Sequence, residues 1–268
     1  RGGLRSGAKI GADDDETGRA MPAAGKSTEG ELPGAAELDH AVWGALTGSQ
    51  RNLGTGTPLA ARFRADVSPF GGFAGEPTAD HWADLAGLVE PGGRVALTGS
   101  VGVPPADWTV ERELVGLQMV GDRIGSTPDG LARSDKPIRL GDADVEDMLA
   151  LVRLAQPGPF LPRTVEFGGY LGVRRQGKLV AMAGQRLRPP GFTEVSAVAT
   201  DPDHRRQGLA EQLIRAVAAD VRERGDTPFL HVDIDNYRAI HLYESIGFTR
   251  RRNVPILVVR GPGSSPPD

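Results

Sequence analysis

The feature that most constrains this chain is a strand, a tight turn and an amphipathic helix that follow one another directly. The strand is predicted over residues 192–200, and the helix over residues 209–224 has an apolar face of Leu213, Ile214, Val217 and Val221. Gly208 and Ala210 are small, so a ligand can approach the backbone of the turn closely. The first helical amides lack internal partners and the helix dipole favours an anion. The junction therefore predicts a pyrophosphate site, with a plain strand–helix connection as the alternative.

A second pattern follows 26 residues after Ala210. Residues 236–248 begin with Asn236, continue through Leu-Tyr-Glu at 242–244 and end in Gly-Phe. Together with the R-x-x-G-x-A pattern at 205–210, this segment resembles the GNAT superfamily of acyl-CoA-dependent N-acyltransferases. In that family the first motif grips the coenzyme A pyrophosphate, and the second helix lies along the pantetheine.

The resemblance covers residues 136–260 and implies a mixed, mostly antiparallel α/β sheet flanked by helices. It also implies acetyl-CoA as the acyl donor co-substrate. Within the family, residues 170–173 and 159–162 look like the branch of glycine N-acyltransferase-like proteins.

The resemblance also assigns residues to the coenzyme. The amide of Val198 is expected to face the thioester oxygen, because backbone groups near the end of the strand pair with the pantetheine in this family. The expected coenzyme contacts are Val198, Ala199, Thr200, Arg205, Arg206, Gln207, Gly208, Leu209, Ala210, Asn236 and Tyr243. Two solvated arginines at 205 and 206 are the alternative reading of that pair.

Two side chains are candidates for proton transfer. An amine near neutral pH is mostly ammonium, so transfer needs a base or a water relay. Alternation along the strand puts Glu194, Ser196 and Val198 on one face, the face expected toward the acceptor. Some protein-modifying members of the family that the chain resembles place a catalytic glutamate sixteen residues before the end of the first motif, which is the offset of Glu194 from Ala210, so the resemblance makes Glu194 the candidate base. Its alternative is a solvent-facing strand residue. Tyr243 is the candidate acid for the leaving thiolate, since an unperturbed phenol stays protonated at neutral pH, and simple packing is its alternative.

The rest of the chain divides by composition and pattern. Residues 1–37 lack aromatic residues and read as a disordered tail, and residues 261–268 read as a second tail. Residues 38–133 contain all three tryptophans and predict a smaller α/β accessory domain, with the degenerate acyltransferase-like half of glycine N-acyltransferase-like proteins as one form it could take. Helices are expected over 38–46 and 78–89, and strands over 61–64, 94–98 and 108–120. A linker with a turn at Pro128-Asp129-Gly130 joins this part to residues 136–260.

Composition excludes several classes of function. The 268 residues carry 31 Lys and Arg against 35 Asp and Glu, which excludes a globally basic nucleic-acid binder. There is no Cys, so disulfides and cysteine chemistry are excluded. The histidines have no ligand spacing, and no metal is expected. Gly25-Lys26-Ser27 fails the P-loop pattern because Ala20 stands where it needs glycine.

The sequence thus predicts a cytoplasmic N-acetyltransferase that moves an acetyl or other short acyl group to a primary amine in a ternary complex. The acceptor is a small molecule or a peptide, with no nucleic acid or membrane partner, and a homodimer is left open. The alternative is a non-catalytic acyl-CoA sensor or interaction module on the same fold.

Overall fold

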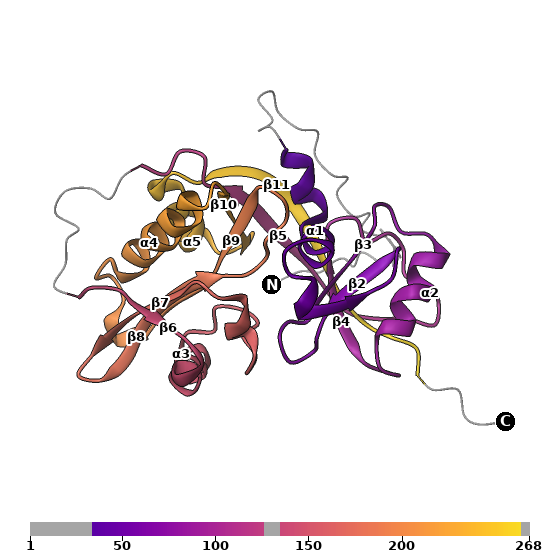
Figure 1. The fold of residues 1–268 in the computed structure, drawn as a ribbon, viewed down its shortest axis with the longest axis horizontal. Helices are drawn as coiled ribbons and strands as arrows, with labels where there is room; N and C mark the ends of the chain where they lie inside the picture. The colour runs from indigo at the N-terminus through magenta and orange to yellow at the C-terminus, as the bar shows by residue number, and fades with distance from the viewer. Residues whose placement is uncertain (1–33, 126–134, 264–268) are drawn as a thin grey trace, which may run out of the picture.

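The computed structural model describes residues 34–125 and 135–263, which fold around one mixed, mostly antiparallel sheet (Figure 1). The expected tail before residue 34, the tripeptide Gly25-Lys26-Ser27, the turn Pro128-Asp129-Gly130 and residues 264–268 lie outside the described residues. The strand order across the described sheet is β1-β2-β3-β4-β11-β5-β10-β9-β8-β7-β6.

The strands are β1 Gly54–Gly56, β2 Ala60–Phe63, β3 Phe70–Phe73, β4 Arg94–Thr98, β5 Thr109–Val120, β6 Ile138–Leu140, β7 Tyr170–Arg175, β8 Lys178–Gln185, β9 Phe192–Thr200, β10 Thr227–Asp233 and β11 Thr249–Arg260. The α-helices are α1 Ala41–Thr47, α2 Ala79–Leu88, α3 Val145–Ala155, α4 Leu209–Glu223 and α5 Tyr237–Ile246. Short 3-10 turns are η1 Ala35–His40, η2 Arg51–Leu53, η3 Asp142–Asp144, η4 Thr164–Phe167 and η5 Pro202–His204.

Polar side chains bind backbone amides at the starts of two helices, α2 and α5. The backbone amide of Thr78 donates to Nδ1 of His81 at the start of α2. The side chain of Asn236 accepts from the amide of Ala239 at the start of α5, which satisfies one of the orphan donors of that helix. The chain ends α5 at Gly247, whose φ of 113° lies in the region that favours glycine.

The central strand β5 comes from the first half of the chain but lies between two strands of the second half. It pairs antiparallel with β10 on one side and with β11 on the other. The far end of β11 also pairs with β4. The sheet therefore runs across the expected boundary between residues 38–133 and 136–260, and that division of the chain stays a prediction.

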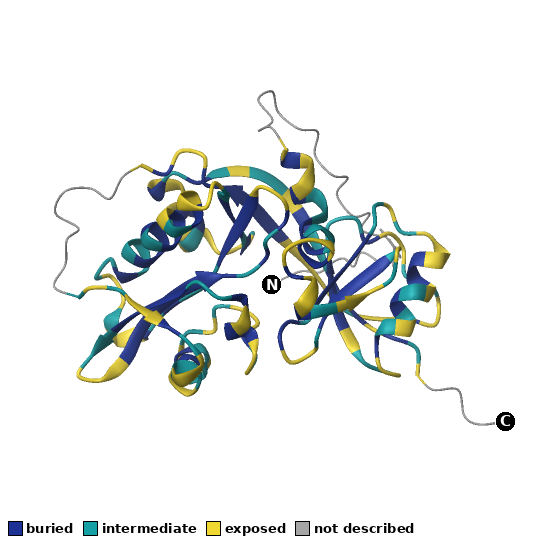
Figure 2. Ribbon diagram, viewed as in Figure 1, coloured by how far each residue is buried: buried dark blue, intermediate teal, exposed yellow. Residues whose placement is uncertain are grey.

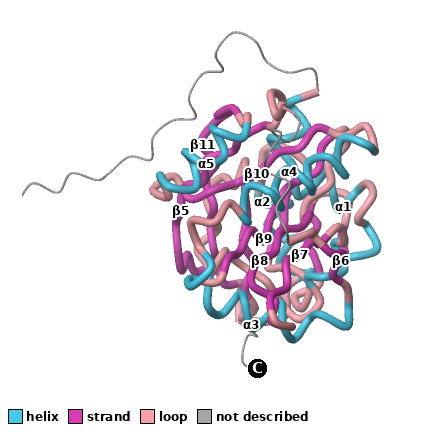
Figure 3. Tube along the Cα trace, turned by 90° about the vertical axis from the view of Figure 1, so that its left-hand side faces the viewer, coloured by secondary structure: helices cyan, strands magenta, loops and turns pink. Residues whose placement is uncertain are grey.

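The two faces of the second half carry different helices (Figure 1). On one face, Leu213 and Val217 of α4 pack in a buried cluster with Val180 and Val195, and Ile240 of α5 joins them. On the other face, the buried residues Met148 and Leu151 of α3 pack in a cluster with Tyr170, Met182 and residues of the first half, including Phe63 and Phe70. The dark central strands show the extent of burial (Figure 2), and a perpendicular view shows β7, β8 and β9 side by side (Figure 3).

The tryptophan-rich part has its own apolar cluster. Trp82 and Trp108 lie 5.1 Å apart between ring centroids and pack near Phe73. Leu257 and Val259 of β11 belong to the same cluster. The last strand of the chain therefore completes the core of the first half.

Candidate functional site

A bulge in β9 sets the geometry of the candidate site. Met182 of β8 opposes Ala199, while Gly184 opposes Ser196, so β9 carries one extra residue over this stretch. Ala197 takes a left-handed φ of 51°, which L residues other than glycine rarely adopt. Because the bulge shifts the alternation, Val195 and Val198 both pack in the cluster beneath α4. The expectation that Glu194, Ser196 and Val198 share one face is therefore wrong.

The strands β9 and β10 part next to this bulge. Their parallel pairing covers three residue pairs and ends at Glu194 and Phe229. From residue 195 to the end of β9 at Thr200, no strand among the described residues pairs with the backbone on the β10 side. Val198, Ala199 and Thr200, three of the predicted coenzyme contacts, lie on this unpaired stretch.

The turn after β9 leads directly into α4. The side chain of Asp201 accepts from the amide of Asp203 and pairs with Nζ of Lys178 at 2.7 Å. These hydrogen bonds from Lys178 and the Asp203 amide lower the pKa of Asp201. Arg206 and Gly208 have left-handed φ values of 60° and 72°, and Gly208 caps α4. A helix start favours an anion, and pyrophosphate binding at this turn stays a prediction.

The polar side chains of this turn differ in their exposure and in their hydrogen-bond partners. Arg205 and Arg206 are exposed, and neither forms an ion pair with another described residue. Gln207 instead accepts a hydrogen bond of 2.5 Å from Arg175 of the β7–β8 hairpin. Leu209 is buried in the core beneath α4, so only its backbone can face a ligand.

A pocket of about 760 Å³ adjoins the turn on the hairpin side. It is lined by Arg174, Arg175, Lys178 and His204, among others. The sequence offered no pattern that would have linked the hairpin residues to the turn, because they lie some 30 positions earlier in the chain.

Tyr243 lies on the buried face of α5. It is 9% exposed, and its ring packs against Phe248 with centroids 5.8 Å apart. Burial raises the pKa of Tyr243 to about 12. Within the part of the chain that the structure describes, its hydroxyl has no hydrogen-bond partner, so the phenol is a protonated donor without a fixed acceptor. Asn236, the other predicted contact on this helix, is exposed.

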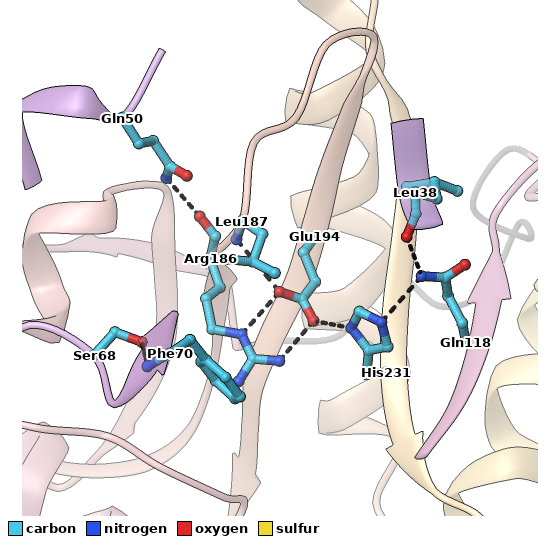
Figure 4. A network of polar contacts seen from close by, with 9 residues as sticks. All are labelled: Leu38, Gln50, Ser68, Phe70, Gln118, Arg186, Leu187, Glu194 and His231. Carbon is cyan, nitrogen blue, oxygen red and sulfur yellow. Dashed lines mark hydrogen bonds and ion pairs between the residues drawn. The ribbon is translucent and has the colours of Figure 1, made fainter. Parts of the chain in front are cut away.

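Glu194 occupies the centre of a buried polar network (Figure 4). Arg186 donates to both of its oxygens, Nη2 to Oε1 at 2.6 Å and Nε to Oε2 at 2.8 Å. The amide of Leu187 and Nδ1 of His231 supply two further donors. The side chain is fully buried, which contradicts a solvent-facing strand residue.

The electrostatics of Glu194 follow from these partners. Burial raises its pKa, but the charge and hydrogen bonds of Arg186 and the hydrogen bond of His231 outweigh burial and hold the pKa well below the ordinary value. Four donors occupy the four lone-pair sites of the carboxylate. In this arrangement Glu194 holds Arg186 and His231 and has no free lone pair for a substrate proton.

The tautomer of His231 follows from its neighbours. Gln118 Oε1 accepts from Arg251, so the amide nitrogen of Gln118 donates to Leu38 and to Nε2 of His231 at 3.1 Å. The imidazole therefore carries its proton on Nδ1 and donates it to Glu194 at 2.8 Å. Sequence reasoning missed Arg186 and His231, because no local pattern reveals a pairing across strands.

Among residues 34–125 and 135–263, no group of three or more His, Asp or Glu could hold a metal ion, and the expected absence of a metal stays a prediction. The helices found there are all too short or too polar to cross a bilayer.

Comparison with known proteins supports the resemblance. The model of a family described as FR47-like protein matches residues 170–255. A solved structure from Novosphingobium aromaticivorans DSM 12444, assigned to the GNAT family of acetyltransferases, is 36% identical with a TM-score of 0.75, and the match covers 86% of this chain and 99% of that chain. The chain belongs to the GNAT family. The GNAT fold expected from the two sequence motifs, with its mixed sheet and flanking helices, is confirmed.

Curated relatives match this GNAT chain over shorter stretches. N-alpha-acetyltransferase RimI of Mycobacterium tuberculosis is 38% identical over 84 residues, which is 30% of this chain and 52% of that protein. Mycothiol acetyltransferase of Thermomonospora curvata is 34% identical over 122 residues, which is 45% of this chain and 38% of that protein. The GNAT chain thus spans about half, or less, of the length of these relatives.

Proposed function

We propose that the chain is an N-acetyltransferase that moves an acetyl or other short acyl group from acyl-CoA to a primary amine by direct transfer in a ternary complex. The observation that carries this proposal is the bulge at Ala197 together with the end of β9–β10 pairing at Glu194. Beyond Glu194 the β10 side of β9 has no strand partner among the described residues, and the chain then passes through η5 to the start of α4.

The proposed coenzyme contacts run from the end of β9 to the start of α4. A pantetheine arm carries amide groups that can pair with free strand backbone, which the stretch from 195 to 200 supplies. The pyrophosphate then meets the amides at the start of α4, where Gly208 has no side chain to obstruct it. Exposed Arg205 and Arg206 supply positive charge without having to leave another ion pair.

The reacting groups are assigned to backbone and phenol. The amide of Val198 donates to the thioester oxygen as negative charge develops there, an interaction worth about 3–4 kcal/mol in other enzymes. Tyr243 donates its proton to the leaving thiolate, and its raised pKa keeps that proton in place at neutral pH.

The ammonium proton of the acceptor amine has two routes out of the site. Direct proton transfer to Glu194 would require Arg186 or His231 to release one of its oxygens. We therefore propose that water relays the proton, because that route needs no rearrangement, with direct transfer to Glu194, the base predicted from the sequence, as the alternative. The two routes differ in their pH dependence.

The acceptor is proposed to be a small-molecule or peptide amine. The relatives point to both classes by name, since one is an N-alpha-acetyltransferase and another is a mycothiol acetyltransferase. We propose that the protein acts in the cytoplasm and has neither a nucleic-acid nor a membrane partner. Whether it forms a homodimer is left open. Placement near glycine N-acyltransferase-like proteins stays a prediction, because these relatives carry other names.

Release of free coenzyme A tests the proposal. The chain is incubated with acetyl-CoA or longer acyl-CoAs and a panel of amines that includes amino acids, polyamines and peptides with a free N-terminus. Release of coenzyme A that depends on one class of amine supports N-acetyltransferase activity. Tight binding of acetyl-CoA without release for any amine favours the alternative, a non-catalytic acyl-CoA sensor.

A further inference from the structure

A pocket of about 620 Å³ lies in the first half of the molecule, away from the GNAT motifs. Its walls come from β2, the turn before β4, the end of β11 and the loop that carries Leu161. The strands β2 and β4 lie beside α2, whereas β9 and α4 lie in the other half (Figure 1). The volume falls within the range of about 300–1,000 Å³ that small-molecule sites occupy.

The lining of this pocket is rich in positive charge. Its charged residues are Arg62, Arg64, Arg94, Arg260 and Glu90. Arg94 and Arg260 both pair with Glu111, and Arg64 pairs with Glu166 at 2.7 Å. Three of the four arginines therefore have a carboxylate partner outside the pocket lining.

Arg62 differs from the other three. It is 8% exposed, and no carboxylate of a described residue lies within 4.0 Å of its guanidinium. Nε donates to the carbonyl of Phe63 at 3.2 Å, and Nη1 makes a long contact of 3.4 Å to the carbonyl of Leu88. Nη2 has no hydrogen-bond partner among the described residues.

A buried guanidinium without a carboxylate is costly, because desolvation is not offset by an opposite charge. Burial lowers the pKa of Arg62, and the more distant charge of Glu90 opposes that shift. Arginine nevertheless keeps its proton in proteins, so the positive charge stays in the pocket. An oxyanion is the partner that a guanidinium fork fits best.

The remaining wall defines the other part of a ligand. Pro69, Leu88 and Leu161 are partly exposed and give the pocket an apolar side, whereas Phe63 is fully buried. We propose that this pocket binds a small organic anion, with its carboxylate or phosphate on Arg62 and an apolar group against Pro69, Leu88 and Leu161.

Isothermal titration calorimetry of the full chain at constant ionic strength tests this site. The probes are phenyl phosphate, phenylacetate and the neutral 2-phenylethanol. We expect one-to-one binding of at least one anion and none of the alcohol, and the two anions show whether phosphate or carboxylate is preferred. Saturating coenzyme A should leave the binding in place, which separates this pocket from the proposed acyl-CoA site. Failure of both anions to bind would overturn the proposal.

Variants locate the binding on Arg62. Arg62→Gln should weaken the anion at least tenfold, while Arg139→Gln, an exposed arginine paired with Asp220, should leave its affinity unchanged. Gly208→Val should also bind the anion as wild type does, because it alters only the acyl-CoA turn. If Arg62→Gln does not fold, Arg62→Lys replaces it and should still lose affinity, since lysine lacks the bidentate fork. Undiminished affinity in the folded Arg62 variant contradicts the inference.

Discussion

Arg186, which directly follows β8, donates two parallel hydrogen bonds to Glu194 of β9, with donor–acceptor distances of 2.6 and 2.8 Å. Arg186 also lies over the ring of Phe70, 4.8 Å from its centroid, and its carbonyl accepts from Gln50. Phe70 and Gln50 belong to the first half of the chain. The ion pair beside the β9 bulge is therefore held partly by that half.

Glu194→Gln should destabilise the fold markedly. The substitution leaves Arg186 as a buried charge without its partner, and breaking such a pair costs about 3–5 kcal/mol. Urea unfolding measures the loss. Glu166→Gln is the matched control, because its partners Arg64 and Arg163 are partly exposed and a pair of that kind contributes at most about 1 kcal/mol. Equal losses in the two variants would show that the Glu194 pair contributes no more than a surface one.

The same pair gives an acid-dependent stability. The pKa of Glu194 is lower in the folded chain than its ordinary value of 4.5, so its contribution is complete above that value and is lost as the pH falls toward the folded-state pKa. We expect the stability of Glu194→Gln to fall less than that of wild type on acidification. Parallel declines in urea midpoints would contradict the assigned pKa direction.

The pH dependence of turnover separates the two proton routes. Since Glu194 is ionised throughout the neutral range, Glu194→Gln should lower kcat by a constant factor without changing the shape of the pH–rate profile. This result favours the water relay. Loss of an acid limb that wild type shows would instead demonstrate that Glu194 takes the proton directly.

Tyr243→Phe should lower kcat without weakening the binding of acetyl-CoA. The ring and its packing on Phe248 are kept, and only the proton donor is removed, which typically costs about 10²–10⁴-fold. Its hydroxyl has no partner among the described residues, so the melting temperature should stay unchanged. Tyr237→Phe, at a residue 64% exposed on the same helix, is the control. Full kcat in Tyr243→Phe, where chemistry limits the rate, would remove the acid role.

Gly208→Val should abolish tight coenzyme binding. A valine at a φ of 72° is strained by about 1–2 kcal/mol, and its side chain lies where the pyrophosphate approaches the backbone. Gly225→Val is the control, because that glycine has a φ of 85° and open space around it just beyond the other end of α4. Calorimetry with coenzyme A should show at least a tenfold loss in the first variant alone. Equal affinities would misplace the site.

Arg205 and Arg206 should contribute through charge. We expect Arg205→Ala and Arg206→Ala each to weaken coenzyme A severalfold, with smaller effects at high salt because exposed charges are screened. Titration with dephospho-coenzyme A shows which arginine contacts the 3′-phosphate. The variant that lacks this arginine should no longer bind coenzyme A more tightly than dephospho-coenzyme A. Arg139→Ala serves as the control. Unchanged affinity in both variants would leave them as solvated side chains.

Much of the fold could be predicted because local patterns were strong. The strand–turn–helix at 192–224 and the helix after Asn236 were found at nearly the expected bounds. The strands β1 and β3 were not predicted, since each contains two glycines, a residue that is unfavourable inside strands. The placement of β5 inside the second half could not follow from its own sequence, because any apolar strand fits several neighbours.

The site was predictable where it is built from backbone and less so where it depends on long-range contacts. The glycine turn was recognised from spacing alone. The bulge at Ala197 was not, because alanine carries no signal for a left-handed φ. Glu194 looked like a free carboxylate because its partner Arg186 lies just after β8 and its partner His231 lies on β10.

The position of β5 also fixes an order of events during synthesis. Val120 emerges from the ribosome long before its partners Phe229 and Thr249 exist. Until those residues are made, both edges of β5 have unsatisfied amides and carbonyls, which are the groups that drive non-native strand pairing. Both native neighbours of β5 are therefore present only when nearly the whole chain has been translated.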